Sequence, residues 1–294
     1  MHCRPVLSIL LLSTLAATAQ ASKFSVPEMD IGRLTFRQTS GLDLGSGTGN
    51  VELSQLELRS LLSRPIALAN DWLVVPLAEY TQTTLDINNR QTASPFHDED
   101  LYSLGLSAFA VHLSESTPWI YGAWARGELA TDFQHVTSDA LTFDLAAAGG
   151  YRFNERFTLA FGAAVFNLNG HVSGYPLIGF DWFVSDALRV SLYGQSFVAA
   201  YTLSQDWKLS LRAKAGGGIW TVTDASGNLR AIDLTTYQIG AYAERRLTGM
   251  LWLTAGLGAC VGNQLNYTTV HGSTLFERAP EAGVFGQIGL RLKL

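Results

Sequence analysis

The chain has 294 residues, of which 47% are hydrophobic and only 15% are charged, with 25 acidic residues against 20 lysines and arginines. Soluble domains carry about 25% charged residues, so this composition disfavours an ordinary soluble domain. The net charge of −5 argues against nucleic acid as a partner, because nucleic-acid binding needs a basic surface.

The N-terminus has the pattern of a secretory signal peptide. Residues 1–21 begin with a short basic start at Arg4, continue as an apolar run and end in Ala19-Gln20-Ala21. The alternative, a single-span membrane anchor, needs about 20 apolar residues, and this run is shorter. We therefore expect cleavage after Ala21 and a mature chain of residues 22–294. That mature chain keeps only Cys260, so it can form no internal disulfide.

Alternating polarity follows the signal peptide along the whole chain. In the segment from Trp207, the apolar residues Trp207, Leu209 and Leu211 alternate with Lys208, Ser210, Arg212 and Lys214. A strand directs successive side chains to opposite faces, so this pattern predicts a strand with one apolar and one polar face. The same reasoning predicts fourteen strands, at residues 31–40, 51–62, 71–84, 100–113, 119–132, 140–152, 157–169, 174–184, 187–195, 198–204, 207–222, 231–246, 250–263 and 283–294. Merging the short 198–204 segment or losing the first pair would give twelve.

The predicted connections alternate between tight and long. The tight ones are Asn154-Glu155, Ser185-Asp186, Ser204-Gln205-Asp206 and Thr248-Gly249, and the long ones are 41–50, 85–99, 133–139, 223–230 and 264–282. Outer-membrane barrels have short periplasmic turns and longer outer loops. If both termini are periplasmic, every tight turn named here falls on the periplasmic side. Two short outer connections, near 170–173 and 196–197, depart from the rule.

No segment after the signal peptide reads as a membrane helix, and a soluble β-sandwich or periplasmic barrel is the main alternative. The wide apolar face and the aromatic residues near strand ends favour the membrane instead, because such girdles mark the two interfaces. The girdle candidates are Trp72, Trp119, Tyr121, Tyr151, Trp182, Trp207 and Trp252. We predict an all-β protein: a single antiparallel up-and-down transmembrane β-barrel of 12–14 strands, with fourteen favoured. Its expected partners are outer-membrane lipids and the barrel-insertion machinery.

The C-terminal part of the chain resembles a known family. Ile288, Leu290, Leu292 and Leu294 share one face of a last strand that resembles the signal read by the insertion machinery, although Leu294 stands where an aromatic residue is usual. The segment Pro176–Trp182, then Ser185-Asp186, the alternating 188–192 segment, Ala200-Tyr201 and the strand from Trp207 resemble an uncharacterised family of bacterial outer-membrane barrels, a domain of unknown function. The resemblance covers about Tyr102 to Leu294. It implies a fold and an outer-membrane location, and no activity.

Two polar segments invite a ligand-binding interpretation. Residues 42–50 match the glycine-rich first motif of methyltransferases, but no alternating strand–helix units follow, so a flexible outer loop is the stronger interpretation. His97-Asp98-Glu99-Asp100 has oxygen ligands for a divalent cation but lacks a glycine-containing ligand loop, which favours a solvated acidic loop edge. We expect no cofactor and no metal.

A His-x-Ser spacing, which places both side chains on one face of a strand, occurs three times. The pairs are His112/Ser114, His171/Ser173 and His271/Ser273. Lipid A deacylases use such a pair with an acid that orients the histidine, and Asp181 and Glu277 are the nearest acids to the last two pairs. Polar loop residues without chemistry remain the stronger interpretation of all three.

Every second residue of a strand faces the same side of the sheet, and this parity (odd or even position) assigns charged residues to the lumen. The cations are Arg33, Arg37, Arg59, Arg126, Arg152, Arg189, Lys208, Arg212, Lys214, Arg246, Arg291 and Lys293, and the carboxylates are Glu57, Glu128, Asp132, Asp144, Asp181 and Glu244. A basic lumen would favour anions. The equally weighted alternative is that these charges pair across the lumen and solvate or plug it.

Three functions follow from these observations. The leading hypothesis is passive passage or binding of small solutes, anions among them, through a basic lumen. The second is a lipid-modifying hydrolase that uses one His-x-Ser pair, and the third is a structural barrel with a plugged lumen.

Overall fold

The computed structural model describes residues 30–45, 49–68, 71–88, 98–112, 114, 116–168 and 171–293, so the predicted signal peptide lies outside the described residues. Fourteen strands form a closed antiparallel barrel, which confirms the fold prediction. They are β1 (Asp30–Asp43), β2 (Asn50–Leu61), β4 (Trp72–Asn88), β5 (Glu99–His112), β6 (Trp119–Thr131), β7 (Leu141–Asn154), β8 (Phe157–Leu168), β9 (His171–Phe183), β10 (Leu188–Tyr193), β11 (Ser196–Thr202), β12 (Trp207–Thr223), β13 (Leu229–Thr248), β14 (Leu251–Thr269) and β16 (Gly283–Lys293). The short strands β3 (Ile66–Leu68) and β15 (Thr274–Arg278) extend two hairpins, and a 3-10 turn (Ser138–Ala140) precedes β7.

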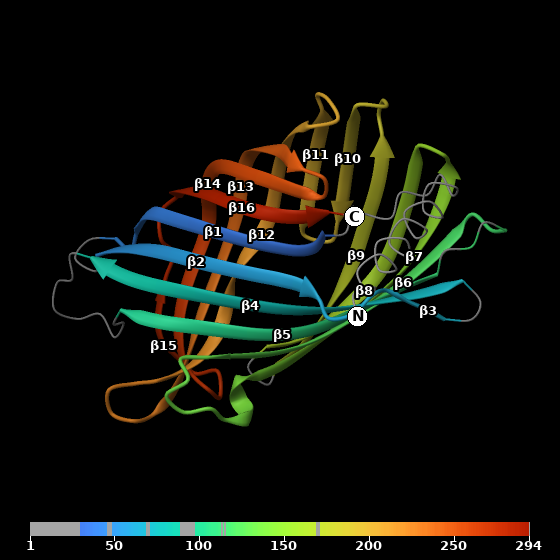
Figure 1. Cartoon of the computed structure of the whole chain (residues 1–294). Coiled ribbons are helices and arrows are strands. Elements are labelled where there is room, and N and C mark those ends of the chain that lie inside the picture. Colours follow the sequence, from blue (N-terminus) through green and yellow to red (C-terminus); the bar gives the residue numbers. More distant parts are fainter. Residues whose placement is uncertain are drawn as a thin grey trace, which may run out of the picture.

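Each barrel strand pairs with its neighbours in the chain, and β1 closes the ring against β16 (Figure 1). The tight connections after β7, β9, β11 and β13 lie at the end where β1 begins and β16 ends, which we call the periplasmic end. The long connections lie at the opposite, outer end. The predicted loop 264–282 is shorter than expected, because β14 continues to Thr269 and β15 pairs back onto it.

At two glycines with positive φ, the strand changes which of its alternate side chains face the lumen. Gly41 (φ 80°) lies at a register shift between β1 and β2, and Gly262 (φ 59°) lies at one between β13 and β14. A bulge inserts one unpaired residue, so the side chains beyond it change faces. Beyond Gly41, Leu42 and Leu44 are buried, and beyond Gly262, Leu265 is buried too.

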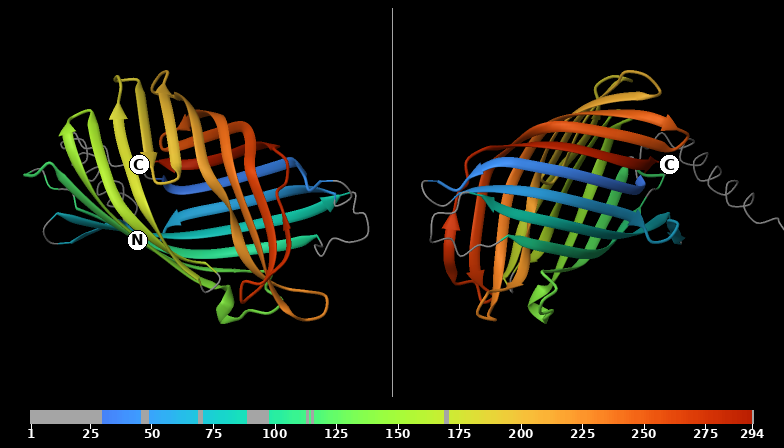
Figure 2. Two further views of the ribbon diagram at one scale, coloured as in Figure 1. Left: turned by 180° about the vertical axis from the view of Figure 1, so that it is seen from behind. Right: turned by 60° about the vertical axis from the view of Figure 1, so that its left-hand side comes forward.

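The barrel is narrower at its outer end than at its periplasmic end. Near the outer end, β12 contacts β6 directly: Thr221 pairs with Thr131, and the Asp132 amide donates to the Thr221 carbonyl at 3.3 Å. This contact bypasses β7–β11, so a ring of nine strands (β12, β13, β14, β16, β1, β2, β4, β5 and β6) encloses the outer half. All fourteen strands enclose the periplasmic half. Figure 2 shows β7–β11 diverging from the rest of the wall.

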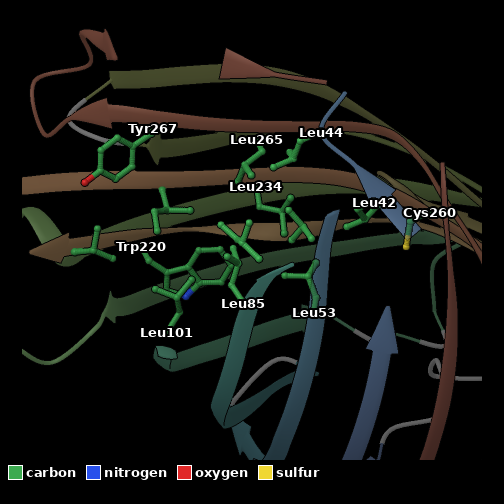
Figure 3. Packing of buried hydrophobic residues seen from close by; sticks show 14 of the residues in the cluster. Leu42, Leu44, Leu53, Leu85, Leu101, Trp220, Leu234, Cys260, Leu265 and Tyr267 are labelled. Atoms are coloured by element: carbon green, nitrogen blue, oxygen red, sulfur yellow. The ribbon is translucent and has the colours of Figure 1, made fainter. Parts of the chain in front are cut away.

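Apolar side chains fill the interior of the nine-stranded half (Figure 3). This apolar plug includes Leu42, Leu44, Val51, Leu53, Leu85, Ile87, Leu101, Trp220, Val222, Ile232, Leu234 and Leu265, each at most 6% exposed. The Trp220 indole donates to the Ser103 hydroxyl at 3.1 Å, from β12 to β5. An eight-stranded barrel is just wide enough for side chains to fill, so a ring of nine can close in the same way.

The outer face of the barrel is apolar and uncovered. Leu106, Leu211 and Leu257 are 62%, 61% and 72% exposed. An apolar outer surface with a plugged or polar interior is the pattern of a barrel surrounded by lipid. Within the described residues, no helix has the length and apolar character to cross a membrane.

Aromatic rings form a chain around this outer face near the periplasmic end. Contacts 5.0–6.4 Å between centroids link Trp72, His112, Tyr121, Trp119, Tyr151, Phe153 and Phe157. Trp182 pairs with Phe157 on the next strand, and Trp207 lies under the Arg245 guanidinium. The girdle assignment of Trp252 is wrong: it is 5% exposed and stacks with Lys208, Arg246 and Lys293, which face the lumen. Its parity with Thr254 and Glu244 directs it inward.

Candidate functional site in the lumen

Ion pairs line the inner wall on the periplasmic side of the apolar plug. The Arg33 guanidinium binds Glu57 across the β1–β2 pair. Glu79 on β4 lies between Arg59 at 3.1 Å and Arg126 at 3.2 Å, and Arg126 also reaches Glu128 at 2.8 Å. These four side chains are 18–31% exposed, so the row is partly solvated. Strands β1, β2, β4 and β6 thus contribute charges of both signs to a belt on the lumen wall.

Glu244 on β13 is the centre of a denser cluster. Its carboxylate binds Arg212 and Arg291, and it accepts from the Lys293 ammonium at 2.6 Å, while its own side chain is only 4% exposed. Arg291 continues the chain to Asp30 at 2.9 Å. One buried carboxylate therefore holds three cations from β12 and β16 together. Removing one partner from such a cluster is destabilising, because it leaves a buried charge uncompensated.

The remaining predicted site residues lie apart from these two clusters. Asp181 accepts a bidentate pair from Arg189 at 2.7 and 2.9 Å between β9 and β10. Arg246 and Lys208 stack on Trp252, and Arg246 also lies 3.7 Å from Asp206. Asp144 is buried on β7, and Arg152 lies on the same strand nearer the periplasmic end. The sequence reasoning did not assign Glu79 and Asp30 to the lumen, so the interior is less basic than parity alone indicated.

Arg37 and Lys214 form no ion pair with a carboxylate among the described residues, although both interact electrostatically with Glu57, which binds Arg33. Arg37 is 6% exposed and donates to the Gln287 amide oxygen at 2.8 and 3.1 Å and to that of Gln55 at 3.1 Å. Lys214 lies on the inner face of β12, opposite Ser196 of β11. Both lie directly on the periplasmic side of the apolar plug. They are the positions at which the lumen can offer positive charge to an anion.

The periplasmic half of the lumen leaves inward-facing side chains exposed. Phe109 on β5 is 40% exposed and Tyr193 on β10 is 45% exposed, although parity directs both inward. The plug residues Leu85 and Leu101 are 0% exposed. A fourteen-stranded ring is wider than its side chains fill, whereas side chains fill the nine-stranded ring. A small cavity of about 10 Å³, at most one water, separates the two zones and is lined by Gln55, Gln238 and Cys260 among others.

The two ligand-like segments have structural explanations. In the glycine-rich loop, Leu42 and Leu44 belong to the apolar plug and the Asp43 carboxylate accepts from the Gly45 amide at 2.8 Å. The loop connects two paired strands, so the methyltransferase interpretation is wrong. Asp98 accepts from the Ile87 amide at 3.0 Å and Asp100 from Thr84 at 2.7 Å, while His97 lies outside the described residues. In the described part of the chain, no three potential metal ligands come together.

The His-x-Ser pairs show no catalytic geometry where they are described. The His112 ring lies between Trp72 and Tyr121 in the aromatic girdle, and the Ser114 hydroxyl lies 2.8 Å from that of Ser116. In the 112/114 and 271/273 pairs, both of which the structure describes, no hydrogen bond joins imidazole and hydroxyl. The side chain of His171 lies outside the described residues, and Ser173 is directed inward on β9.

Comparisons with known proteins identify a family and structural neighbours. The model of a family described as a domain of unknown function (DUF6268) matches residues 55–293. No curated protein matches the chain. Among solved structures, the COG4313 outer membrane channel from Pseudomonas putida F1 has a TM-score of 0.52 at 13% identity, over 93% of this chain and 98% of that chain. The Pseudomonas putida toluene transporter TodX has a TM-score of 0.32 at 10% identity, over 94% and 93%.

Proposed function

The chain belongs to the DUF6268 family of domains of unknown function, and on that premise we propose that it is an outer-membrane channel for small solutes, with a preference for anions. The observation that carries the proposal is the change of width along one barrel. The nine-stranded outer half is filled by leucines and Trp220, whereas the fourteen-stranded half leaves Phe109 and Tyr193 exposed to the lumen.

The proposed anion preference depends on a few cations at one level of the lumen and not on the total number of lumen cations. Most of these cations hold a carboxylate, so much of their positive charge is offset at long range. Arg37 and Lys214 form no direct ion pair among the described residues. Together with Arg33 they outnumber Glu57, the carboxylate that interacts with all three, at the level where the lumen narrows. Cations at a constriction favour anion passage, because the ion must shed water beside them.

Ion-selectivity measurements in planar bilayers test this proposal. The wild-type protein should show small conductance steps, because the apolar plug leaves at most a narrow path for ions through the outer half, and the reversal potential in a salt gradient should indicate anions. Arg37→Gln combined with Lys214→Met should move the reversal potential towards cations. Cation selectivity in the wild-type protein would refute the anion preference. Absence of any conductance, together with absence of solute uptake by proteoliposomes, would refute the channel.

The plug and the paired charges favour a second function, a structural barrel without transport. This barrel would hold its ion pairs for stability alone. It predicts that neither ions nor uncharged solutes cross proteoliposome membranes at any salt concentration, and that variants at Arg37 and Lys214 change stability without changing permeability.

A further inference from the structure

The barrel wall has a gap in strand pairing beyond the β10–β11 hairpin. β10 has 6 residues and β11 has 7, whereas the flanking β9 and β12 have 13 and 17. β10 pairs with residues 179–183 of β9, and β11 pairs with residues 208–214 of β12. Among the described residues, no strand pairs with the facing edges of β9 172–177 and β12 216–220. The hairpin is the short yellow one in Figure 2.

The gap lies at the depth of the bilayer. Trp207 belongs to the periplasmic aromatic girdle, and Lys214, opposite the end of the hairpin, is seven residues farther along β12. At about 3.3 Å per residue and a tilt of about 40°, seven residues climb about 18 Å. The apolar band of such barrels is about 25 Å tall, so the hairpin turn and the gap beyond it lie at the level of the outer leaflet.

The edges of the gap are suited to being unpaired. Ile178 accepts from the Gly194 amide, so even-numbered residues of β9 direct their backbone groups towards the gap, and Pro176 has no N–H to leave unpaired. On β12 the facing edge is Gly216–Gly218. A Cβ at Gly216 would lie 2.8 Å from the Gln238 amide, and one at Gly218 would lie 2.7 Å from the Trp220 ring. Gly216, Gly217 and Gly218 therefore contribute no side chain that could close this part of the rim.

Irregular backbone at membrane depth is tolerated where it lines a protein or water-filled cavity. The cavity available here is the wide periplasmic half of the lumen, since the outer half is filled. The inner face of β7–β9 behind the gap carries mostly small or apolar residues, including Ala146, Ala148, Ala160, Gly162, Ala164 and Leu177. Among the described residues of this face, charges appear only towards its ends, at Asp144 on the outer side and at Arg152 and Asp181 on the periplasmic side.

A cation stands at the inner rim of the same gap. Leu177 and Lys214 flank the hairpin turn from opposite sides. A Cβ atom built on Gly194 would lie 3.4 Å from the Leu177 side chain. On the other side, the Ala215 amide, next to Lys214, donates to the Gln195 carbonyl. Lys214 makes no ion pair with any residue that the structure describes. Its charge interacts with Glu57 and with Arg33, Arg37 and Arg212, so cations outnumber carboxylates around it. The apolar inner face of β7–β9 thus begins beside the Lys214 ammonium. This arrangement fits a molecule with an acyl chain and one negative charge.

We propose that this gap is a lateral portal through which a single-chain anionic amphiphile, a long-chain carboxylate, passes from the outer leaflet into the lumen. Its chain lies along the inner face of β7–β9, and its carboxylate binds Lys214. The proposal rests on the channel function proposed above and gives that channel an entrance on the periplasmic side of the plug.

Equilibrium binding of radiolabelled dodecanoate to the protein in lipid nanodiscs tests the head-group site, with protein-free nanodiscs as the blank. Wild-type protein should bind dodecanoate saturably above the blank. Lys214→Met should weaken binding about tenfold, and Lys214→Arg should restore it. Binding of dodecan-1-ol, which has the same chain and no charge, should not respond to Lys214→Met. Wild-type binding equal to the blank, or dodecanoate affinity unchanged in Lys214→Met, would overturn the proposal.

Two neighbouring positions test the portal itself. Leu177→Trp adds bulk on the inner side of the rim, and Ile178→Trp adds the same bulk on the outer face, where Ile178 is 54% exposed. Stopped-flow association of dodecanoate should slow about fivefold or more in Leu177→Trp and stay unchanged in Ile178→Trp, with both variants folded by heat-modifiable gel mobility. Equal rates in the two variants would overturn the portal. Loss of ion conductance with amphiphile binding intact would instead refute the small-solute channel alone.

Discussion

Truncating Trp220 to alanine removes the largest ring of the apolar plug. The side chain is 2% exposed and its indole donates to Ser103 at 3.1 Å, so the variant loses both packing and a buried hydrogen bond. Trp→Ala changes in cores cost about 3–5 kcal/mol, and a buried hydroxyl left unpaired costs about 1–3 kcal/mol. Because these losses overlap, we expect the free energy of unfolding to fall by about 4–6 kcal/mol. Urea unfolding in lipid vesicles measures this loss.

The same variant should open the outer half of the barrel to ions. Single-channel recordings of Trp220→Ala are expected to show larger conductance steps than those of the wild-type protein. Leu106→Ala is the matched control, because Leu106 lies on β5 like Ser103 but is directed outward and is 62% exposed. A folded Trp220→Ala barrel with the conductance of the wild type would refute the idea that this cluster closes the lumen.

Three further predictions follow from the described contacts. Glu244→Gln leaves Arg212, Arg291 and Lys293 without their shared carboxylate, so urea unfolding should show a loss of about 3–5 kcal/mol; a loss below about 1 kcal/mol would contradict the shared role. Cys260 is 1% exposed, so a maleimide should modify it only after denaturation, and rapid labelling of the folded barrel would contradict its burial. The hydrogen bond from the Asn228 backbone amide lowers the pKa of Asp224 in the β12–β13 turn. The charged carboxylate therefore orders the turn at pH values above the pKa of Asp224 in the unfolded chain. This order is lost as the pH falls through the lower pKa of Asp224 in the folded protein. Amide exchange at residues 226–228 should therefore differ between wild type and Asp224→Asn at neutral pH and converge in acid; a difference that persists in acid would contradict this role.

Polarity alternation identified the barrel where the two faces differ in chemistry. On β12, Lys208, Arg212 and Lys214 contrast with Trp207, Leu209 and Leu211, and the parity of this strand is readable at once. The tight turns were equally clear, because two or three polar residues between strands leave little choice of hairpin. Family membership and the fourteen strands therefore followed from the sequence.

Alternation fails where the lumen itself is apolar. Leu73, Val74 and Val75 on β4 are all apolar, so parity gave no sign that Val75 is directed inward, or that Glu79 continues the same face. The bulge at Gly41 exchanges faces within a segment that looked like a loop, which concealed Leu42 and Leu44. In these segments the lumen face and the lipid face of the strand are both apolar, so only the pairing register in the folded barrel shows which residues face the lumen.

The contact that narrows the barrel had no signal in the sequence. Thr131 and Thr221 are 90 residues apart, and neither their type nor their neighbours indicate that β6 and β12 meet. Trp252 is different, because it shares parity with Thr254 and Glu244 opposite, and this could have identified it as inward. The girdle prediction for Trp252 relied on its position near a strand end and did not use the inward parity of its neighbours.

We infer that one face of the barrel wall contacts lipid while the other encloses the lumen. Nitroxide labels placed singly at cysteine substitutions of residues 207–212 in reconstituted protein test it directly, by comparing collision with oxygen, which concentrates in lipid, and with a water-soluble nickel chelate. We predict strict alternation, with residues 207, 209 and 211 reached by oxygen and residues 208, 210 and 212 not. Equal access of the nickel chelate to residues 207, 209 and 211 would contradict a lipid-facing wall.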